Sequence, residues 1–145
     1  MKKSIVIALG SCFISLPTIA AQHCTQDTTR GTWEYTCEGL LSPAPGVPML
    51  NTRLLGTCSA SSTAHWDCQG SANVGGQVVD QALHGDAVNN SDCTGEITYA
   101  NYIFGQRQPE DLVIRYVIRD KGDTINGLPV QPGQILACVL HRMSI

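Results

Sequence analysis

The sequence predicts a mainly β fold, a small antiparallel β-sandwich or barrel stapled by three disulfides. Segments in which apolar and polar residues alternate recur along the chain, as is typical of strands with one buried face. No long segment shows the 3.6-residue periodicity of a helix. Six cysteines follow the N-terminal apolar run, and an even number of cysteines in an exported chain indicates three disulfides.

The first residues have the pattern of a bacterial export signal. Two lysines precede a short apolar run, and the small residues at 18–21 suit cleavage by signal peptidase. We therefore expect a signal peptide at 1–21 and a single disulfide-stapled β domain at 22–145, located in the periplasm or secreted. The alternative is a lipoprotein signal in which Cys12 is lipidated. It is disfavoured because the apolar stretch before Cys12 is only about five residues long.

Three short strands are expected in the first half of the domain, at residues 32–37, 54–59 and 64–68. In the first and third of them, a tryptophan shares a face with a cysteine, which indicates that this face is buried. The Pro-rich segment 42–50 cannot hold a regular helix or a central strand. We predict an extended surface loop there.

The second half contains the strongest strand patterns. Strands are predicted at 96–104, 112–119 and 134–143. The second of these has one apolar face and one half-exposed face, whereas both faces of 134–143 are apolar, so we expect 134–143 to be a central strand. Residues 71–90 are ambiguous, because 78–83 fits one short helix or one strand.

The cysteine spacing favours one set of disulfides among the fifteen that six cysteines allow. Two pairs of cysteines flank predicted turns, and a hairpin would bring each pair to cross-strand distance. The third pair would then tie the start of one strong strand to the C-terminal strand. The favoured set is Cys24–Cys37, Cys58–Cys68 and Cys93–Cys138.

Histidine and aspartate supply the main candidates for chemistry. The sequences 65–67 and 84–86 both read His-x-Asp, and on a strand residues i and i+2 point the same way. His84, Asp86 and His141 also follow the order of a two-His, one-carboxylate iron site. Their neighbours are turn-forming residues, so a surface position is favoured over a metal site, and no cofactor is predicted.

Several other classes of function are disfavoured. Removal of residues 1–21 takes the formal net charge from −3 to −5, and no basic run remains, so nucleic acid is not an expected partner. No second long apolar segment follows the signal, so no transmembrane segment is expected after cleavage. The cysteines are expected to be oxidised, which excludes a cysteine nucleophile, and the motifs of serine hydrolases and phosphate-binding loops are absent.

Two features are candidates for binding. Val47, Met49 and Leu50 make the end of the Pro-rich loop apolar, and a stiff loop loses less entropy when it docks. Tyr102 is expected to be exposed, because the apolar residues of its strand take the opposite face. We predict an exported non-enzymatic binding protein, such as an inhibitor, an immunity factor or a surface ligand-binder, whose partner is a protein or a glycan outside the cytoplasm.

Two alternatives stay open. One is a secreted small enzyme or toxin, which would be metal-dependent if His84, Asp86 and His141 converge. The other is a structural component of a surface assembly.

Overall fold

The protein folds into one antiparallel sheet that closes into a barrel. The structure is a computed structural model that describes residues 22–42 and 44–144; the predicted signal peptide at 1–21 lies outside the described residues. The elements in chain order are η1 (Gln26–Thr29), β1 (Gly31–Leu41), β2 (Leu50–Ala60), β3 (His65–Val74), β4 (Gln77–Asn89), β5 (Thr94–Ile103), β6 (Gln106–Arg107), β7 (Leu112–Arg119), η2 (Asp120–Gly122), β8 (Thr124–Pro129) and β9 (Gln134–Arg142).

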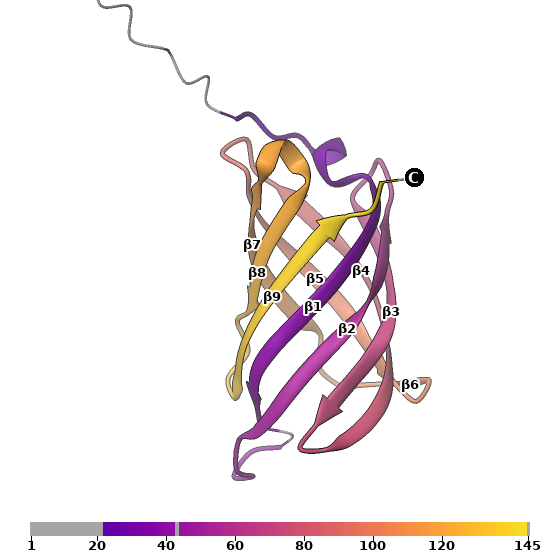
Figure 1. The fold of residues 1–145 in the computed structure, drawn as a ribbon, viewed down its shortest axis with the longest axis vertical. Coiled ribbons are helices and arrows are strands. Elements are labelled where there is room, and N and C mark those ends of the chain that lie inside the picture. The colour runs from indigo at the N-terminus through magenta and orange to yellow at the C-terminus, as the bar shows by residue number, and fades with distance from the viewer. Residues whose placement is uncertain (1–21, 43, 145) are drawn as a thin grey trace, which may run out of the picture.

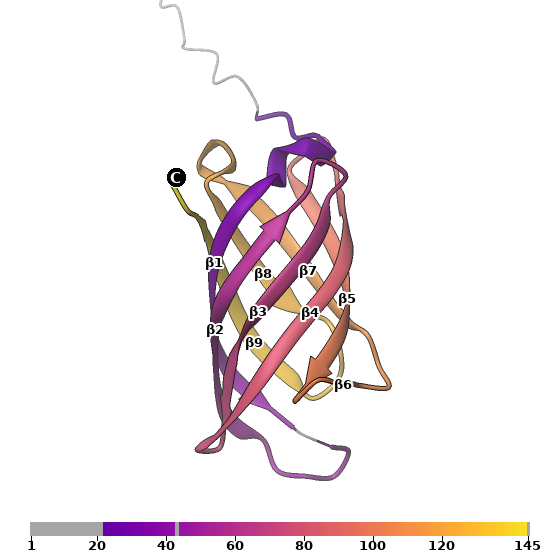
Figure 2. The same ribbon diagram turned by 90° about the vertical axis from the view of Figure 1, so that its right-hand side faces the viewer.

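The topology is an up-and-down meander of eight barrel strands. Each barrel strand pairs with the next one along the chain, and β9 returns to pair with β1, which closes the barrel (Figures 1 and 2). The short β6 pairs with β5 in a hairpin that projects from the wall. This architecture confirms the predicted mainly β class. Neither helix in the described residues is long and apolar enough to cross a membrane.

The predicted alternation places side chains on the expected sides of the wall. On β1, Trp33 and Tyr35 face inward, and on β7 Tyr116 and Ile118 face inward while Arg115 is exposed. Apolar residues at every second position can therefore share one core inside a single curved sheet. Because the apolar residues recur at every second position, they share one face only in a strand, which is why strands rather than long helices form this core.

Two strands differ from the sequence prediction. The ambiguous segment 71–90 is strand: β3 continues to Val74, turns at Gly75 and Gly76, and returns as β4. Both glycines have positive φ, which suits a tight hairpin. β8 has no counterpart among the predicted strands, because its short stretch contains Asn, Gly and Pro, which are depleted in strands.

β9 is a central strand as predicted, because it pairs with β1 on one side and with β8 on the other, but only one of its two apolar faces is turned toward the core. Its inward residues are half-buried or buried, but Ile135 on the outer face is 65% exposed and Ala137 is exposed as well. A barrel wall has only one interior face, so an apolar outer face stays in contact with solvent.

The disulfides confirm one predicted pair and correct two. Cys58 and Cys68 are linked and lie directly opposite each other on β2 and β3. The predicted links Cys24–Cys37 and Cys93–Cys138 are wrong. The structure instead joins Cys24 to Cys93 and Cys37 to Cys138. Cys37 and Cys138 are register partners because β1 meets β9, a pairing that hairpin spacing along the chain does not reveal.

Three intramolecular disulfides are typical of proteins that work outside the cytoplasm.

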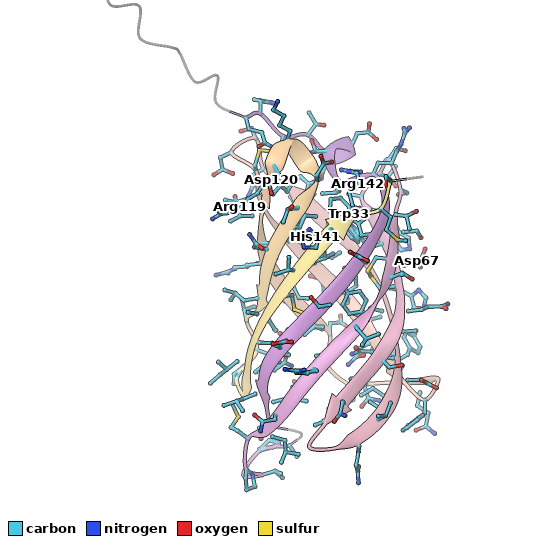
Figure 3. The ribbon with its side chains drawn as sticks, viewed as in Figure 1. Trp33, Asp67, Arg119, Asp120, His141 and Arg142 are labelled. Atoms are coloured by element: carbon cyan, nitrogen blue, oxygen red, sulfur yellow. A yellow bond between two sulfur atoms is a disulfide. The ribbon has the colours of Figure 1, made fainter. Side chains whose placement is uncertain are left out.

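Arg142 closes one end of the barrel. Its guanidinium carbon lies 4.4 Å from the centre of the Trp33 ring (Figure 3). The same group donates hydrogen bonds to the carbonyl oxygens of Thr28, Gly122 and Arg30. Because Trp33 is fully buried, Arg142 ties the segment around η1 and the β7–β8 connection onto the top of the core.

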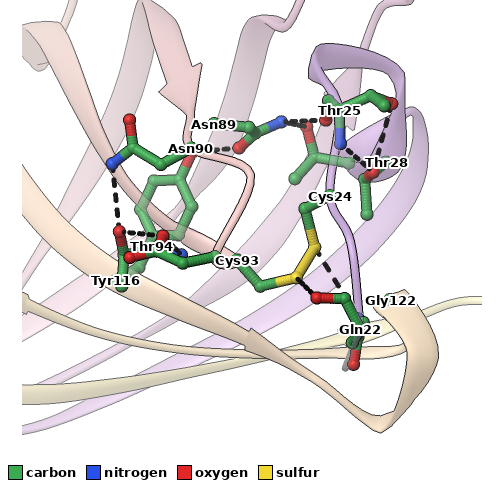
Figure 4. Close-up of a disulfide and its surroundings, with 12 residues drawn as sticks. Gln22, Cys24, Thr25, Thr28, Asn89, Asn90, Cys93, Thr94, Tyr116 and Gly122 are labelled. Atoms are coloured by element: carbon green, nitrogen blue, oxygen red, sulfur yellow. Dashed lines mark hydrogen bonds between the residues drawn. A yellow bond between two sulfur atoms is a disulfide. The ribbon is translucent and has the colours of Figure 1, made fainter. Parts of the chain in front are cut away.

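A second set of contacts holds η1 over the same end. The Asn89 amide donates to the carbonyl oxygen of Thr25 and accepts a 2.6 Å hydrogen bond from the Tyr116 hydroxyl. The Cys24–Cys93 disulfide joins the segment before η1 to the β4–β5 turn beside it (Figure 4). No helix of residues 22–42 and 44–144 covers the opposite end, where the loops at 44–49 and 130–133 lie.

Candidate functional site

A cavity of about 130 Å³ lies inside the barrel, in the half away from η1. Inward side chains from all eight barrel strands line it, mostly aliphatic ones such as Leu54, Leu83 and Ile103. None of the lining residues is charged. Eight strands give an interior that is either filled by side chains or just wide enough for one small ligand. A cavity of similar size, about 150 Å³ with an apolar lining, accepts benzene in another protein.

The lining contains a few polar groups, and two of their atoms have no hydrogen-bond partner. The Gln81 amide nitrogen donates to Asn101 Oδ1 over 3.0 Å. The Tyr99 hydroxyl donates to Cys68 Sγ over 3.6 Å. In contrast, the Tyr35 hydroxyl and Gln81 Oε1 are buried without a partner. Burial raises the pKa of the Tyr35 hydroxyl, so it is a neutral donor at physiological pH.

The sequence analysis did not select this cavity or its polar residues. A signal was present, because Gln81 and Asn101 are polar residues at inward positions of otherwise apolar faces on β4 and β5. Such an interruption of the alternation indicates a polar group inside the core. The register needed to see that the two side chains meet is available only from the paired strands.

The residues predicted for binding lie on the outside. Val47 and Met49 are exposed in the β1–β2 loop, and Met49 and Leu50 line an open groove with residues of the β3–β4 turn. Tyr102 is half-buried on the outer face of β5, where its ring meets the His84 ring edge to face with the centres 5.4 Å apart. The loop residues and Tyr102 therefore belong to different parts of the surface.

The closest contacts of the two His-x-Asp sequences run between the strands, although His65 Nε2 also lies 3.7 Å from Asp67 Oδ1 within β3. His65 Nδ1 lies 2.7 Å from Asp86 Oδ1, and His84 Nδ1 lies 2.7 Å from Asp67 Oδ1. The antiparallel register of β3 and β4 places each histidine directly opposite the aspartate of the other sequence. All four side chains are at the solvent-facing side of the wall.

This arrangement predicts a pH-dependent contribution from His65. The hydrogen bond to Asp86 raises the pKa of His65 above its ordinary value of 6.5, and the charge of Asp67 adds to the effect. The protonated pair therefore stabilises the folded state below about pH 6.5, and this contribution is lost as the pH rises through the folded-state pKa. An NMR titration should show that Asp86→Asn lowers the pKa of His65. Asp80→Asn, which removes an exposed carboxylate from the same strand, should leave that pKa unchanged.

His84, Asp86 and His141 are not brought together. The first two lie on β4 and His141 lies on β9, and three strands separate β4 from β9 in either direction around the barrel. Figure 3 shows His141 on the wall in front, beside β1. Within the described residues no group of three or more His, Cys, Asp or Glu side chains is placed to hold a metal ion.

Of the two concave regions described above, the groove beside the β1–β2 loop is the larger and more open one, whereas the cavity inside the barrel is the apolar and uncharged one. Comparisons with protein-family models, with curated proteins and with solved structures find no match to this chain.

Proposed function

We propose that this protein is an exported, non-enzymatic binding protein that holds a small apolar molecule inside its barrel. The cavity of about 130 Å³ carries the proposal, because it is mostly apolar, uncharged and lined by side chains of all eight barrel strands. Concave apolar sites with a few polar groups are the usual form of small-molecule sites. Export is supported by the sequence pattern of residues 1–21 and by the three disulfides.

The chemistry of the lining favours binding over catalysis. Its polar side chains are amides and hydroxyls, and its cysteines are joined in disulfides. General acid–base catalysis needs a group that titrates near the working pH, usually a histidine or a carboxyl group. The histidines and carboxylates described above lie on the outer surface, away from the cavity.

Benzene is a suitable probe for this site, because its size matches the cavity. Calorimetric or NMR titration of the wild-type protein should show saturable binding, with chemical-shift changes at the methyl groups of Leu54 and Leu83. Ala72 is 5% exposed and lines the cavity from β3. Ala72→Phe should fill the space and weaken benzene binding by at least about tenfold, a loss of roughly 1.4 kcal/mol.

A matched control is Ala137→Phe, which adds the same ring to the outer face of β9. This variant should bind benzene like the wild type. Circular dichroism checks that both variants keep the barrel. An absence of saturable benzene binding in the wild type, or shift changes confined to outer-face residues, would refute the proposal without reference to any variant.

A further inference from the structure

The Tyr35 hydroxyl is placed inside the cavity by two glycines. A Cβ atom built on Gly56 would lie 2.7 Å from Tyr35 Cε1, and one built on Gly70 would lie 2.5 Å from the Tyr35 hydroxyl oxygen. Any other residue at these two positions would displace the tyrosine. The ring therefore crosses the inner face of β2 and reaches β3, a strand that is not the direct neighbour of β1.

This placement brings the hydroxyl to Gly70, the residue of β3 that pairs with Gln81 of β4. The Gln81 side chain also lines the cavity. The hydrogen bond from the Gln81 amide nitrogen to Asn101 Oδ1 orients the amide group, so its nitrogen already has a partner. Its acceptor atom, Oε1, is left without a partner, as is the Tyr35 hydroxyl.

The two atoms are complementary to one kind of ligand group. Tyr35 is 6% exposed and its hydroxyl is a neutral donor, whereas Gln81 Oε1 is an acceptor. A group that accepts from Tyr35 and donates to Gln81 would satisfy both, and buried polar groups without partners are unfavourable. A hydroxyl or a primary amide has this double capacity. A hydrocarbon has neither property.

The lining also selects against charge. It contains no arginine, lysine, histidine or carboxylate that could pair with an ion. A carboxylate or an ammonium group in this space would be buried without a counter-charge, which costs far more than burying a neutral polar group.

We propose that the ligand is an uncharged molecule with an apolar body of about the size of benzene and one hydroxyl or amide group, held between Tyr35 and Gln81. This inference rests on the proposed function, since it names the class of ligand for the same cavity.

The test compares three probes that share one benzene ring, phenol, benzene and benzoate, by isothermal titration calorimetry at pH 7. Tyr35→Phe keeps the ring that packs on the glycines and removes only the hydroxyl. It should weaken phenol binding by about tenfold and change benzene binding by less than about twofold. Gln81→Leu should have the same selective effect. Benzoate should show no saturable binding.

Tyr102→Phe is the matched control, because it removes a tyrosine hydroxyl from the outer face of β5 and should change none of the three affinities. Equal weakening of phenol and benzene by both cavity variants would overturn the assigned anchor, as would benzoate binding as tight as that of phenol. In either case benzene binding by the wild type would keep the proposed function. If none of the probes binds the wild type, the proposed function fails as well. Should Tyr35→Phe not fold, Gln81→Leu decides the matter alone.

Discussion

A variant in which both Cys37 and Cys138 are replaced by alanine should lose about 4–5 kcal/mol of the free energy of unfolding, the largest loss expected from removing a single disulfide. The reason is the length of the loop that the disulfide closes. The two cysteines are separated by 101 positions in the sequence. The chain-entropy model gives about 4.7 kcal/mol for a loop of roughly 100 residues, because the cross-link restricts the unfolded chain over that whole length.

The Cys58–Cys68 disulfide provides the matched comparison. It also joins register partners on neighbouring strands and is also buried, but its sequence separation is 10. The double alanine variant at these positions should lose about 2.7 kcal/mol by the same model. Urea denaturation of both variants measures the difference. An equal loss in the two, or a larger loss for Cys58–Cys68, would contradict the explanation by loop length.

The second large effect is expected at the closed end. Arg142→Met should lower the free energy of unfolding by on the order of 3 kcal/mol, because three carbonyl oxygens lose a charged donor and Trp33 loses its cover. Methionine replaces the apolar stem of the arginine side chain and removes the guanidinium group. Thermal or urea denaturation gives the change in stability, and near-ultraviolet circular dichroism reports the altered surroundings of Trp33.

Arg53→Met is the control for this prediction. Arg53 makes an ion pair with Glu38 on the outside of β1 and β2, with its side chain 77% exposed. Exposed pairs of this kind contribute less than about 1 kcal/mol. Similar losses for the two variants would show that Arg142 acts as an ordinary surface residue and not as the closure of the barrel.

The fold class could be predicted because alternation of apolar residues is a local property. The faces of β1, β5 and β7 follow directly from it, and Trp33, Tyr35 and Tyr99 are buried as their positions in the pattern require. Local patterns also predicted the Cys58–Cys68 disulfide correctly, because it joins the two strands of one hairpin. They could not identify Cys37 and Cys138 as partners, since that pairing depends on how the sheet closes.

The candidate site could not be predicted from the sequence either, because it also depends on how the sheet closes. The cavity exists because eight strands close around it, and its polar groups come together because Tyr35 of β1 reaches over β2 to Gly70 of β3, the register partner of Gln81. Gln81 and Asn101 interrupt apolar faces in the sequence, but the sequence does not show that Tyr35 belongs to the same part of the interior. The histidines show the same limit, because the pattern indicated pairs within one strand, whereas the closest partner of each histidine lies on the neighbouring strand.

The pairing of β1 with β9 has a consequence for the order of folding. Hairpins between neighbouring strands form from contacts that are close along the chain, whereas this pair requires contacts between distant residues, which slows folding. We therefore expect the β2–β3 hairpin to be oxidised early and Cys37 to meet Cys138 late, once β9 has docked. During refolding, the appearance of the Cys37–Cys138 bond would then mark the moment at which the barrel becomes a closed container.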